Sequence, residues 1–272
     1  MDKGLKPFLK WPGGKFRLRT RIIEALNGGD RLIEPFLGSA AVFLNAGFGD
    51  NLLADSNPDL ITLYKQLLRN KERFIKATES LFTDENNCEE KYYEFRNEFN
   101  SCTDKQRRAS LFVYLNRHCY NGLCRYNSKG IFNTPFGRYT RPRVPRKEML
   151  HFIETAAHAT FECADYQDTM NKAKRGDVVY CDPPYVPLSA TSYFTDYHVG
   201  GFNWDDQILL AEKAEHLAKQ GVRVVISNHD TKKTRSLYKE RNAKITIFDV
   251  QRTISCNPSN RKKAKELLAI FG

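Results

Sequence analysis

Residues 31–44 read RLIEPFLGSAAVFL, and this stretch decides the fold. Residues 31–34 have the pattern of a short buried strand, residues 35–39 form a tight loop, and residues 40–44 are typical of a helix. A strand, a loop and a helix in this order predict an α/β fold. Ligands of such folds bind beyond the carboxyl ends of the strands, so the loop after Glu34 is a candidate binding loop.

Strand and helix patterns alternate on both sides of a different central region. Residues 58–68 indicate a helix with Pro58 in its first turn and Ser56 or Asn57 as its cap. Further strands are expected at 52–54, 177–180, 222–226 and 244–250, and a helix at 205–219 that Gly221 closes. These elements predict one open, mostly parallel sheet.

The central region changes first to charged amphipathic helices and then to an irregular stretch of Asn, Gly, Pro, Arg and aromatic residues. We therefore expect a catalytic domain made of residues 1–56 and 146–272. An inserted, mainly helical domain is expected to occupy residues 57–145.

Composition excludes several classes of protein. The chain has 272 residues, of which 41% are hydrophobic and 28% charged, so neither wholesale disorder nor a membrane core is expected. The amino terminus lacks the apolar stretch of a signal peptide. Seven cysteines without a CxxC pair are interpreted as reduced thiols, and no metal site is predicted. We expect a cytoplasmic protein with no membrane contact.

The positive charge is concentrated in one segment. The chain has 43 basic and 32 acidic residues, a net charge of +11. Residues 105–147 contain no acid but eleven basic residues: Lys105, Arg107, Arg108, Arg117, Arg125, Lys129, Arg138, Arg141, Arg143, Arg146 and Lys147. Like charges in such a run repel one another unless an anion is present, which favours a polyanionic partner for this segment.

Two carboxylates follow the first two predicted strands. Asp55 comes after Glu34 at a separation suited to a carboxylate that binds ribose hydroxyls. The loop at Gly38 does not match G-x-G-x-x-G, which disfavours a nicotinamide dehydrogenase. Taken alone, this loop is equally compatible with a purely structural role, in which Gly38 is a turn glycine and Asp55 an acid at the start of a helix.

The strand at 177–180 runs into Cys181-Asp182-Pro183-Pro184-Tyr185. Two prolines end a parallel strand and make a rigid turn, because each lacks an N–H and has a restricted φ. A turn of this kind suits chemistry on an exocyclic aromatic amine, such as the amino group of adenine. Such an amine is a poor nucleophile, because its lone pair is delocalised into the ring. Asp182 and the carbonyl of Pro183 can each accept an amine hydrogen while Tyr185 stacks on the base. The alternative is a surface turn with a packed tyrosine.

Together these segments resemble the Dam-type DNA adenine N6-methyltransferases, which use S-adenosyl-L-methionine. The matching segments run in order over nearly the whole chain, at 10–15, 34–39, 54–55, 116–117, 120–127, 132–133, 135–138, 182–185 and 226–230. The resemblance implies a Rossmann-like S-adenosylmethionine methyltransferase sheet with an inserted, mainly helical DNA-recognition domain. The family loop usually carries a glycine where this chain has Ala40.

The resemblance also implies the site residues. The catalytic turn is Asp182, Pro183, Pro184 and Tyr185. The cofactor S-adenosyl-L-methionine is expected at Trp11, Lys15, Glu34, Phe36, Gly38, Asp55, Asp165, Tyr166 and Asp182. The DNA-binding residues implied are Lys10, Arg117, Tyr120, Asn121, Leu123, Arg125, Pro135, Arg138 and Tyr139. Among these, Tyr120 is placed to fill the gap left by a flipped base, and the arginines suit guanine or phosphate.

The resulting hypothesis is a site-specific methyltransferase that acts on the N6 amino group of a flipped-out adenine in duplex DNA, within GATC. Its partner is double-stranded DNA, and no oligomer is required. A bacterial source would associate the enzyme with the nucleoid. The alternatives are a catalytically inactive DNA-binding protein of the same fold and a cytosine-N4 or RNA-base methyltransferase, because those amines need similar chemistry.

Overall fold

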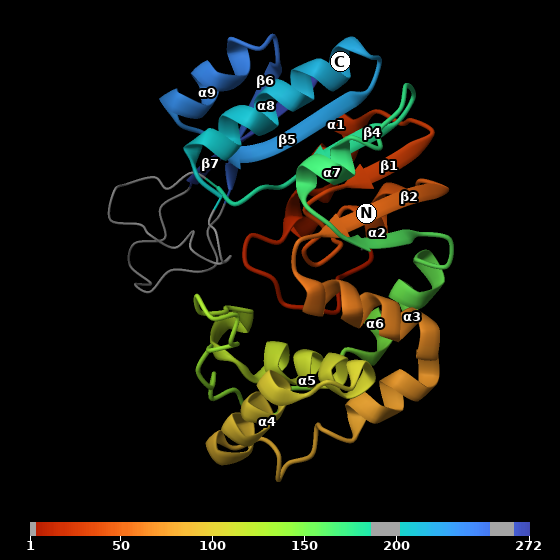
Figure 1. Cartoon of the computed structure of the whole chain (residues 1–272), viewed down its shortest axis with the longest axis vertical. Helices are drawn as coiled ribbons and strands as arrows, with labels where there is room; N and C mark the ends of the chain where they lie inside the picture. Colours follow the sequence, from red (N-terminus) through yellow and green to blue (C-terminus); the bar gives the residue numbers. More distant parts are fainter. Residues whose placement is uncertain (1–3, 186–201, 251–263) are drawn as a thin grey trace. The chain divides into compact units, whose positions relative to one another are not determined.

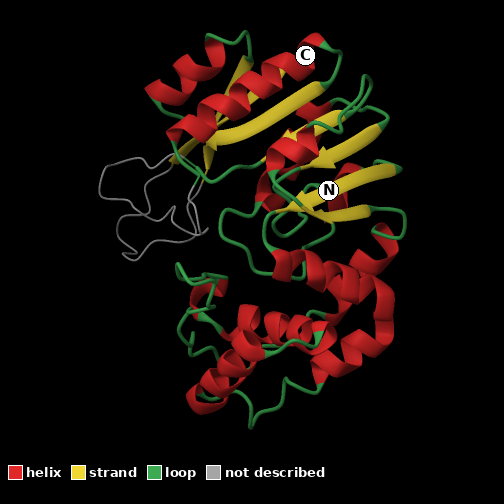
Figure 2. Cartoon of the chain, viewed as in Figure 1, coloured by secondary structure: helices red, strands yellow, loops and turns green. Residues whose placement is uncertain are grey.

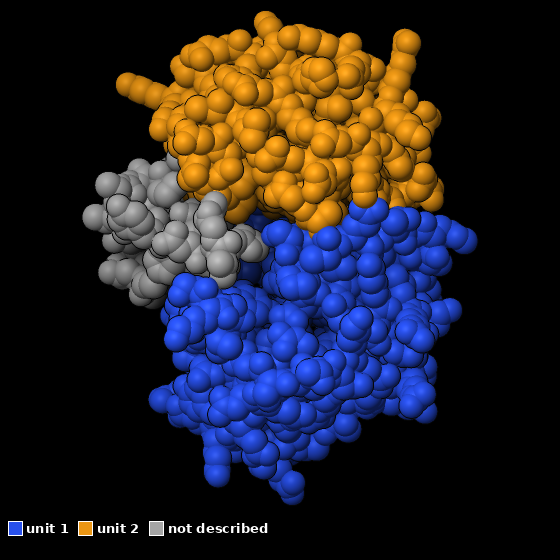
Figure 3. All heavy atoms as spheres, viewed as in Figure 1, with its two compact units in different colours: residues 1–19, 37–47, 55–163 blue, residues 20–36, 48–54, 164–272 orange. Residues whose placement is uncertain are grey.

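A computed structural model describes residues 4–185, 202–250 and 264–272 of the chain. These residues form two compact units, shown in different colours in Figure 3. The first unit comprises residues 1–19, 37–47 and 55–163, and the second comprises residues 20–36, 48–54 and 164–272. The functional division of residues 1–56 and 146–272 from residues 57–145 stays a prediction.

The second unit is built on a mostly parallel sheet (Figure 2). Its strands follow the order β2 (Asp50–Asp55), β1 (Arg31–Glu34), β4 (Val178–Cys181), β5 (Arg223–His229), β7 (Ala264–Phe271) and β6 (Lys244–Val250). The first four are parallel, whereas β7 is antiparallel to both of its neighbours. The predicted Rossmann-like sheet is confirmed, with β7 as a strand that the sequence patterns had not indicated.

Three helices cover one face of this sheet (Figure 1): α7 (Tyr166–Met170), α8 (Trp204–Lys219) and α9 (Lys232–Lys239). Alternate strand residues, among them Ile33, Val179 and Val224, pack against these helices in one apolar core. Helix α8 begins with a capping box between Asn203 and Asp206, and α1 (Arg19–Leu26) is a further helix among the described residues of this unit. The carboxyl end of the parallel strands is thereby held by a rigid, close-packed scaffold.

The first unit is mainly helical. Its elements are η1 (Lys15–Leu18), α2 (Phe43–Ala46), α3 (Pro58–Glu79), α4 (Glu89–Ser101), α5 (Lys105–His118), η2 (Tyr120–Gly122), α6 (Arg146–Thr155) and the strand β3 (Thr160–Cys163). Asn57 caps α3, accepting hydrogen bonds from the N–H groups of Asp59 and Leu60 at 3.0 and 3.2 Å, which resolves the choice between Ser56 and Asn57. The expected helix at 40–44 is wrong in its start, because Ala40 has a left-handed φ of 62° and α2 begins only at Phe43.

Residues 119–145 have little regular structure but are closely tied to the helices. Isolated bridges pair Cys119 with Phe136 and Tyr126 with Phe132. The side chain of Asn100 on α4 accepts from the N–H of Phe132 at 2.9 Å and donates to its carbonyl at 3.1 Å. Backbone groups that a sheet would satisfy are therefore satisfied by a helix side chain.

The described residues contain neither a membrane-spanning helix nor a metal-binding cluster. None of their helices is both long and apolar enough to cross a membrane, and no cluster of three or more His, Cys, Asp or Glu in the described ranges is arranged to hold a metal ion. The cysteines found there, Cys88, Cys102, Cys119, Cys124, Cys163 and Cys181, are free thiols, whereas Cys256 lies outside the described residues.

The imidazole of His118 lies buried at the end of α5. It is 1% exposed, stacks on the Tyr114 ring with centroids 3.9 Å apart, and its Nδ1 lies 2.8 Å from the Tyr114 carbonyl oxygen. Burial, with smaller contributions from the charges of Lys10 and Arg117, lowers the pKa of His118 from 6.5 to about 4. The native state therefore holds this ring neutral.

This burial predicts a pH-dependent loss of stability. Below pH 6.5 the unfolded chain protonates His118 while the folded chain does not, so the stabilisation is present above pH 6.5 and disappears as the pH falls to about 4. The loss should reach roughly 3 kcal/mol in the free energy of unfolding. Urea unfolding at a series of pH values measures it, and His118→Phe, which cannot titrate, should show a smaller decline. Equal declines in both proteins would contradict the prediction.

Candidate functional site

The Asp182-Pro183-Pro184-Tyr185 turn leaves the sheet directly after β4. The Tyr185 hydroxyl donates to Glu266 Oε2 at 3.0 Å, and its ring lies edge-on to His229 with centroids 4.7 Å apart. Burial, followed by the charges of Asp182 and Glu266, raises the pKa of Tyr185 well above its usual value, so the phenol stays protonated. The turn is therefore held in one orientation by neighbouring strands.

Aromatic rings gather beside the loop after β1. Phe36 and Tyr166 are stacked at 5.3 Å with an interplanar angle of 22°. Phe202 meets both rings edge-on, at 5.7 Å from Phe36 and 5.6 Å from Tyr166. Asp165, next to Tyr166, caps α7 by accepting from the N–H of Gln167 at 2.8 Å. The predicted residues Phe36, Asp165 and Tyr166 are thus brought together in the second unit.

The Tyr166 hydroxyl is a buried polar group. Tyr166 is 6% exposed, and among the described residues its hydroxyl forms no hydrogen bond of regular geometry, although the side chain of Gln167 lies near enough to lower its pKa slightly. Burial raises the pKa of this phenol to about 12, so it remains a donor at neutral pH. Buried hydroxyls in folded proteins are normally bonded, so this one suits a polar ligand group beside the rings.

Phe202 was missed by the sequence analysis, although a signal for it exists. It directly precedes Asn203, the cap of α8, and an apolar residue at that position commonly packs against its surroundings and fixes the entry of the chain into the helix. Which rings it meets could not be inferred, because Phe36 and Tyr166 lie far from it in the sequence.

In the first unit, the loop at Gly38 is fastened to Asp55. Asp55 Oδ2 accepts from the N–H of Gly38 at 2.9 Å, and Oδ1 accepts from the N–H of Asn57 at 2.9 Å. The carboxylate therefore joins the loop at Gly38 to the residue that caps α3. The Tyr64 hydroxyl, which the sequence analysis did not single out, donates to the Gly38 carbonyl at 2.6 Å.

Trp11 lies against the same loop. Gly38 has a left-handed φ of 48°, and a methyl group built on its Cα would lie 2.8 Å from Trp11 Nε1. Lys15 is 5% exposed, and its Nζ donates to the Gly13 carbonyl at 2.6 Å. The structure therefore brings Trp11, Gly38 and Asp55 together, with Lys15 buried on the turn that follows Trp11.

Ala40 also has a left-handed backbone, with φ at 62°, and it is fully buried. This conformation costs an alanine about 1–2 kcal/mol relative to the right-handed region, whereas glycine adopts it freely. The glycine usual at this position in the resembling family suits the observed backbone, in which the N–H of Ala40 donates to the Leu37 carbonyl at 2.9 Å.

Lys10 is the centre of one group of predicted DNA-binding residues. Its backbone N–H and carbonyl pair with the Asn116 side chain at 2.9 and 2.7 Å, and its Nζ lies 4.0 Å from the centre of the Tyr139 ring. The Tyr139 hydroxyl accepts from the N–H of Asn121 at 2.9 Å. Lys10 Nζ also donates to the Arg117 carbonyl at 3.4 Å, so these predicted residues form one group.

A second group lies on the irregular segment. Thr134 Oγ1 donates to the Leu123 carbonyl at 2.5 Å and accepts from the N–H of Arg125 at 3.2 Å. The guanidinium of Arg125 is exposed and donates from Nε to Asn133 Oδ1 at 2.9 Å. The N–H of Tyr120 donates to the Pro135 carbonyl at 2.9 Å. The Tyr120 side chain is 46% exposed, the accessibility that insertion between bases requires.

The expectation that the basic run requires an external anion is wrong for five of its members. Arg107 forms two hydrogen bonds with Glu98, and Arg108 two with Asp59. The other pairs are Arg146 with Glu72 and Glu79, Arg138 with Glu89 at 3.5 Å, and Arg141 with Asp84 at 3.8 Å. The acids come from outside residues 105–147, so the chain fold itself offsets charge that looks unbalanced along the sequence.

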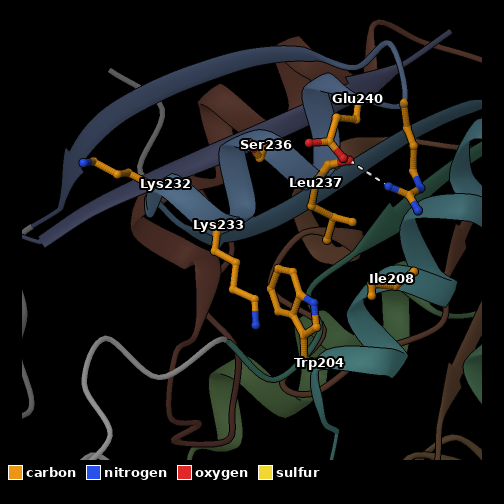
Figure 4. A pocket seen from close by; sticks show the side chains of 8 residues that line it. Trp204, Ile208, Lys232, Lys233, Ser236, Leu237 and Glu240 are labelled. Carbon is orange, nitrogen blue, oxygen red and sulfur yellow. Dashed lines mark hydrogen bonds between the residues drawn. The ribbon is translucent and has the colours of Figure 1, made fainter.

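A separate hollow of about 570 Å³ lies between α8 and α9. Figure 4 shows Trp204 and Ile208 of α8 facing α9, with Lys233 Nζ 3.7 Å from the centre of the Trp204 ring. None of the predicted catalytic, cofactor or DNA-binding residues lines it.

Comparisons with known proteins agree with the order of the motifs. The family model of the D12 class N6 adenine-specific DNA methyltransferases matches residues 11–254. DNA adenine methylase of Escherichia coli (strain K12) is 50% identical over 266 residues, which cover 98% of this chain and 95% of that protein. The Serratia marcescens DNA adenine methylase is 50% identical over 98% of both chains. That of Vibrio cholerae (strain N16961) is 47% identical over 99% of this chain and 97% of its own.

The contact between Gly38 and Trp11 yields a prediction. Gly38→Ala should lower stability by more than the roughly 1–2 kcal/mol of a left-handed alanine, because the new methyl group also displaces Trp11. Binding of S-adenosyl-L-methionine, measured by calorimetry, should weaken as well.

Gly47→Ala is the matched control for this change. Gly47 has a similar φ of 74°, yet nothing lies within 4 Å of a methyl group built there. It should lose only the backbone contribution and keep its binding affinity. Equal losses of stability and unchanged affinity in both variants would contradict the assignment of Trp11 and Gly38 to the cofactor site.

Proposed function

Because this chain belongs to the D12 class of N6 adenine-specific DNA methyltransferases, we propose that it methylates the adenine of GATC in duplex DNA, with S-adenosyl-L-methionine as the methyl donor. The site sequence is supported by the relatives named DNA adenine methylase and by the Dam-type order of motifs. The observation that carries the chemistry is the anchored Asp182-Pro183-Pro184-Tyr185 turn at the end of β4. Because its substrate is DNA, we expect the enzyme in the cytoplasm. In a bacterium it would be associated with the nucleoid.

The proposed cofactor residues fit the parts of S-adenosyl-L-methionine. The Asp55 carboxylate suits the ribose hydroxyls, and the stacked Phe36 and Tyr166 suit the adenine ring. Lys15 suits the methionine carboxylate, with Trp11, Glu34, Gly38 and Asp165 completing the set. When bound, the cofactor supplies a methyl group on a positively charged sulfur. The buried Tyr166 hydroxyl, which forms no regular hydrogen bond among the described residues, and the close approach of Trp11 to Gly38 are the observations that support this fit.

The turn after β4 orients the target amine. Asp182 and the Pro183 carbonyl each accept one N6 hydrogen, which holds the nitrogen closer to tetrahedral and directs its lone pair away from the ring. In the transfer, N6 would gain its bond to the methyl carbon as the bond between that carbon and the cofactor sulfur breaks, and the surplus N6 proton would pass to the Asp182 carboxylate. Tyr185 supports the base face, and its ring is already fixed by Glu266 and His229. The rate enhancement comes chiefly from positioning.

The two groups of the first unit divide the work of DNA recognition. Arg125, supported by Asn133, is suited to bond guanine bidentately, and Leu123 and Pro135 are suited to contact thymine methyl groups. Tyr120 fills the gap left by the flipped adenine. Lys10, Asn121, Arg138 and Tyr139 contact bases or the adjacent backbone, and Arg117 contacts phosphate.

Methyl transfer from labelled cofactor to duplex DNA tests the proposal. DNA treated with the pure protein should resist a nuclease that GATC adenine methylation blocks, and nucleoside analysis should yield N6-methyladenine. Asp182→Ala should lower turnover by roughly 10²-fold or more while DNA binding persists. No incorporation would favour an inactive DNA-binding protein. N4-methylcytosine, or labelling of RNA in place of DNA, would identify the corresponding alternative, and continued cutting would contradict the GATC assignment.

The paired and unpaired arginines and lysines predict different salt dependence. Lys129 and Arg143 are exposed and have no carboxylate partner within the described part of the chain, whereas Arg107 is bonded to Glu98. The logarithm of the DNA-binding constant falls linearly with the logarithm of the salt concentration, and loss of one phosphate contact reduces the steepness of this fall by about 0.9. Titration of Lys129→Ala and Arg143→Ala with labelled duplex should show this decrease, and Arg107→Ala should not. Equal slopes in all three variants would exclude a specific contribution of the unpaired residues.

A further inference from the structure

The turn after β4 cannot anchor itself through backbone donors. Pro183 and Pro184 have no N–H, and their φ angles are fixed by the ring. Asp182 and Pro183 each precede a proline, which restricts their ψ angles as well. The ψ angle of Pro184 is the first backbone torsion of the turn that these restrictions leave free to vary. This angle sets the direction of the Pro184 carbonyl.

A buried glutamine holds that carbonyl. Gln207, on the first turns of α8, is 2% exposed, and its Nε2 donates to the Pro184 carbonyl at 2.8 Å. Its Oε1 accepts from Asn228 Nδ2 at 2.9 Å. An amide taken out of water without partners would cost about 1–3 kcal/mol, so both ends of this side chain are committed to their bonds.

Asn228 in turn is fixed by two more elements. It lies on β5, is fully buried, and its Nδ2 also donates to the Tyr238 hydroxyl on α9 at 3.0 Å. The 226–230 segment belongs to the Dam-type pattern, yet the proposed chemistry gives it no task. The bonds connect α9, β5 and α8 in one chain that ends on the turn.

We propose that Gln207 is a positioning residue for methyl transfer, which it serves by fixing the Pro184 carbonyl and hence the direction of Asp182 and the Pro183 carbonyl. This inference rests on the proposed function. Gln207 touches neither substrate nor cofactor; it acts through the turn. A displacement of about 1 Å at a reacting group costs on the order of 10²-fold in rate, so loss of its bond should appear in the transfer step.

The test is Gln207→Met, which keeps the length of the side chain and removes both bonds. The single-turnover rate of methyl transfer to a GATC duplex should fall on the order of 10²-fold. The KM for DNA and the dissociation constant for S-adenosyl-L-methionine should change less than threefold, because the side chain bonds to Pro184 and Asn228. A second variant, Gln207→Asn, keeps the amide but is one methylene too short to span both partners, and should show the same loss.

Asn51→Leu is the matched control. Asn51 is another buried amide of the second unit, 4% exposed, and donates to the Phe48 carbonyl at 2.9 Å at the amino end of β2. The Asn51→Leu variant should have a lower melting temperature and an unchanged single-turnover rate of methyl transfer. If Gln207→Met does not fold, Gln207→Asn decides the matter. Unchanged single-turnover rates, or losses that track the melting temperature in all three variants, would overturn the inference. Failure of the wild-type protein to transfer methyl groups would instead reject the proposed function.

Discussion

The two prolines after β4 impose the constraint on which the second unit depends. A turn without backbone donors must be held by groups from other elements, and the strand register places such groups beside the turn. Cys181 pairs with Ile226, so the chain leaves β4 beside Asn228 and His229 of β5. His229 pairs with Glu266 on the antiparallel β7, which sets that carboxylate within reach of Tyr185. The insertion of β7 next to β5 therefore completes the support of the turn.

The first unit solves a similar problem with carboxylates. Asp55 bonds the N–H groups of Gly38 and Asn57, so one side chain ties the loop to the start of α3. Asp59, in the first turn of that helix, bonds Arg108 and accepts from the Tyr126 hydroxyl at 2.7 Å. Asp55 at the end of β2 thereby organises the loop, and Asp59 of α3 organises the irregular segment. The positive charge left for a polyanion is correspondingly smaller than the sequence suggests.

Local patterns predicted local structure well. The bounds of β1 and β6 agree with the predicted strands, and the helix α8 differs by one residue at its start. Pro58 was correctly expected in the first turn of α3, whereas the choice of Asn57 over Ser56 as its cap came from the structure. Helix α2 was expected too early because Ala40 has a left-handed φ, which an alanine gives no reason to expect. The partners of the basic run were not predicted. Glu98 and Asp59 are separated from Arg107 and Arg108 along the sequence, and only the fold brings these side chains together.

The amino-acid sequence by itself determined the α/β sheet, the turn that ends β4 and the order of motifs that identifies the family, because each depends on residues close together along the chain. Tertiary structure decided which groups hold that turn and how much basic charge is free. Gln207 and Glu266 carry no local signature of their roles at the turn. A hydrogen bond or ring contact requires two groups at a fixed distance and angle, and only the packing of helices on the sheet supplies both.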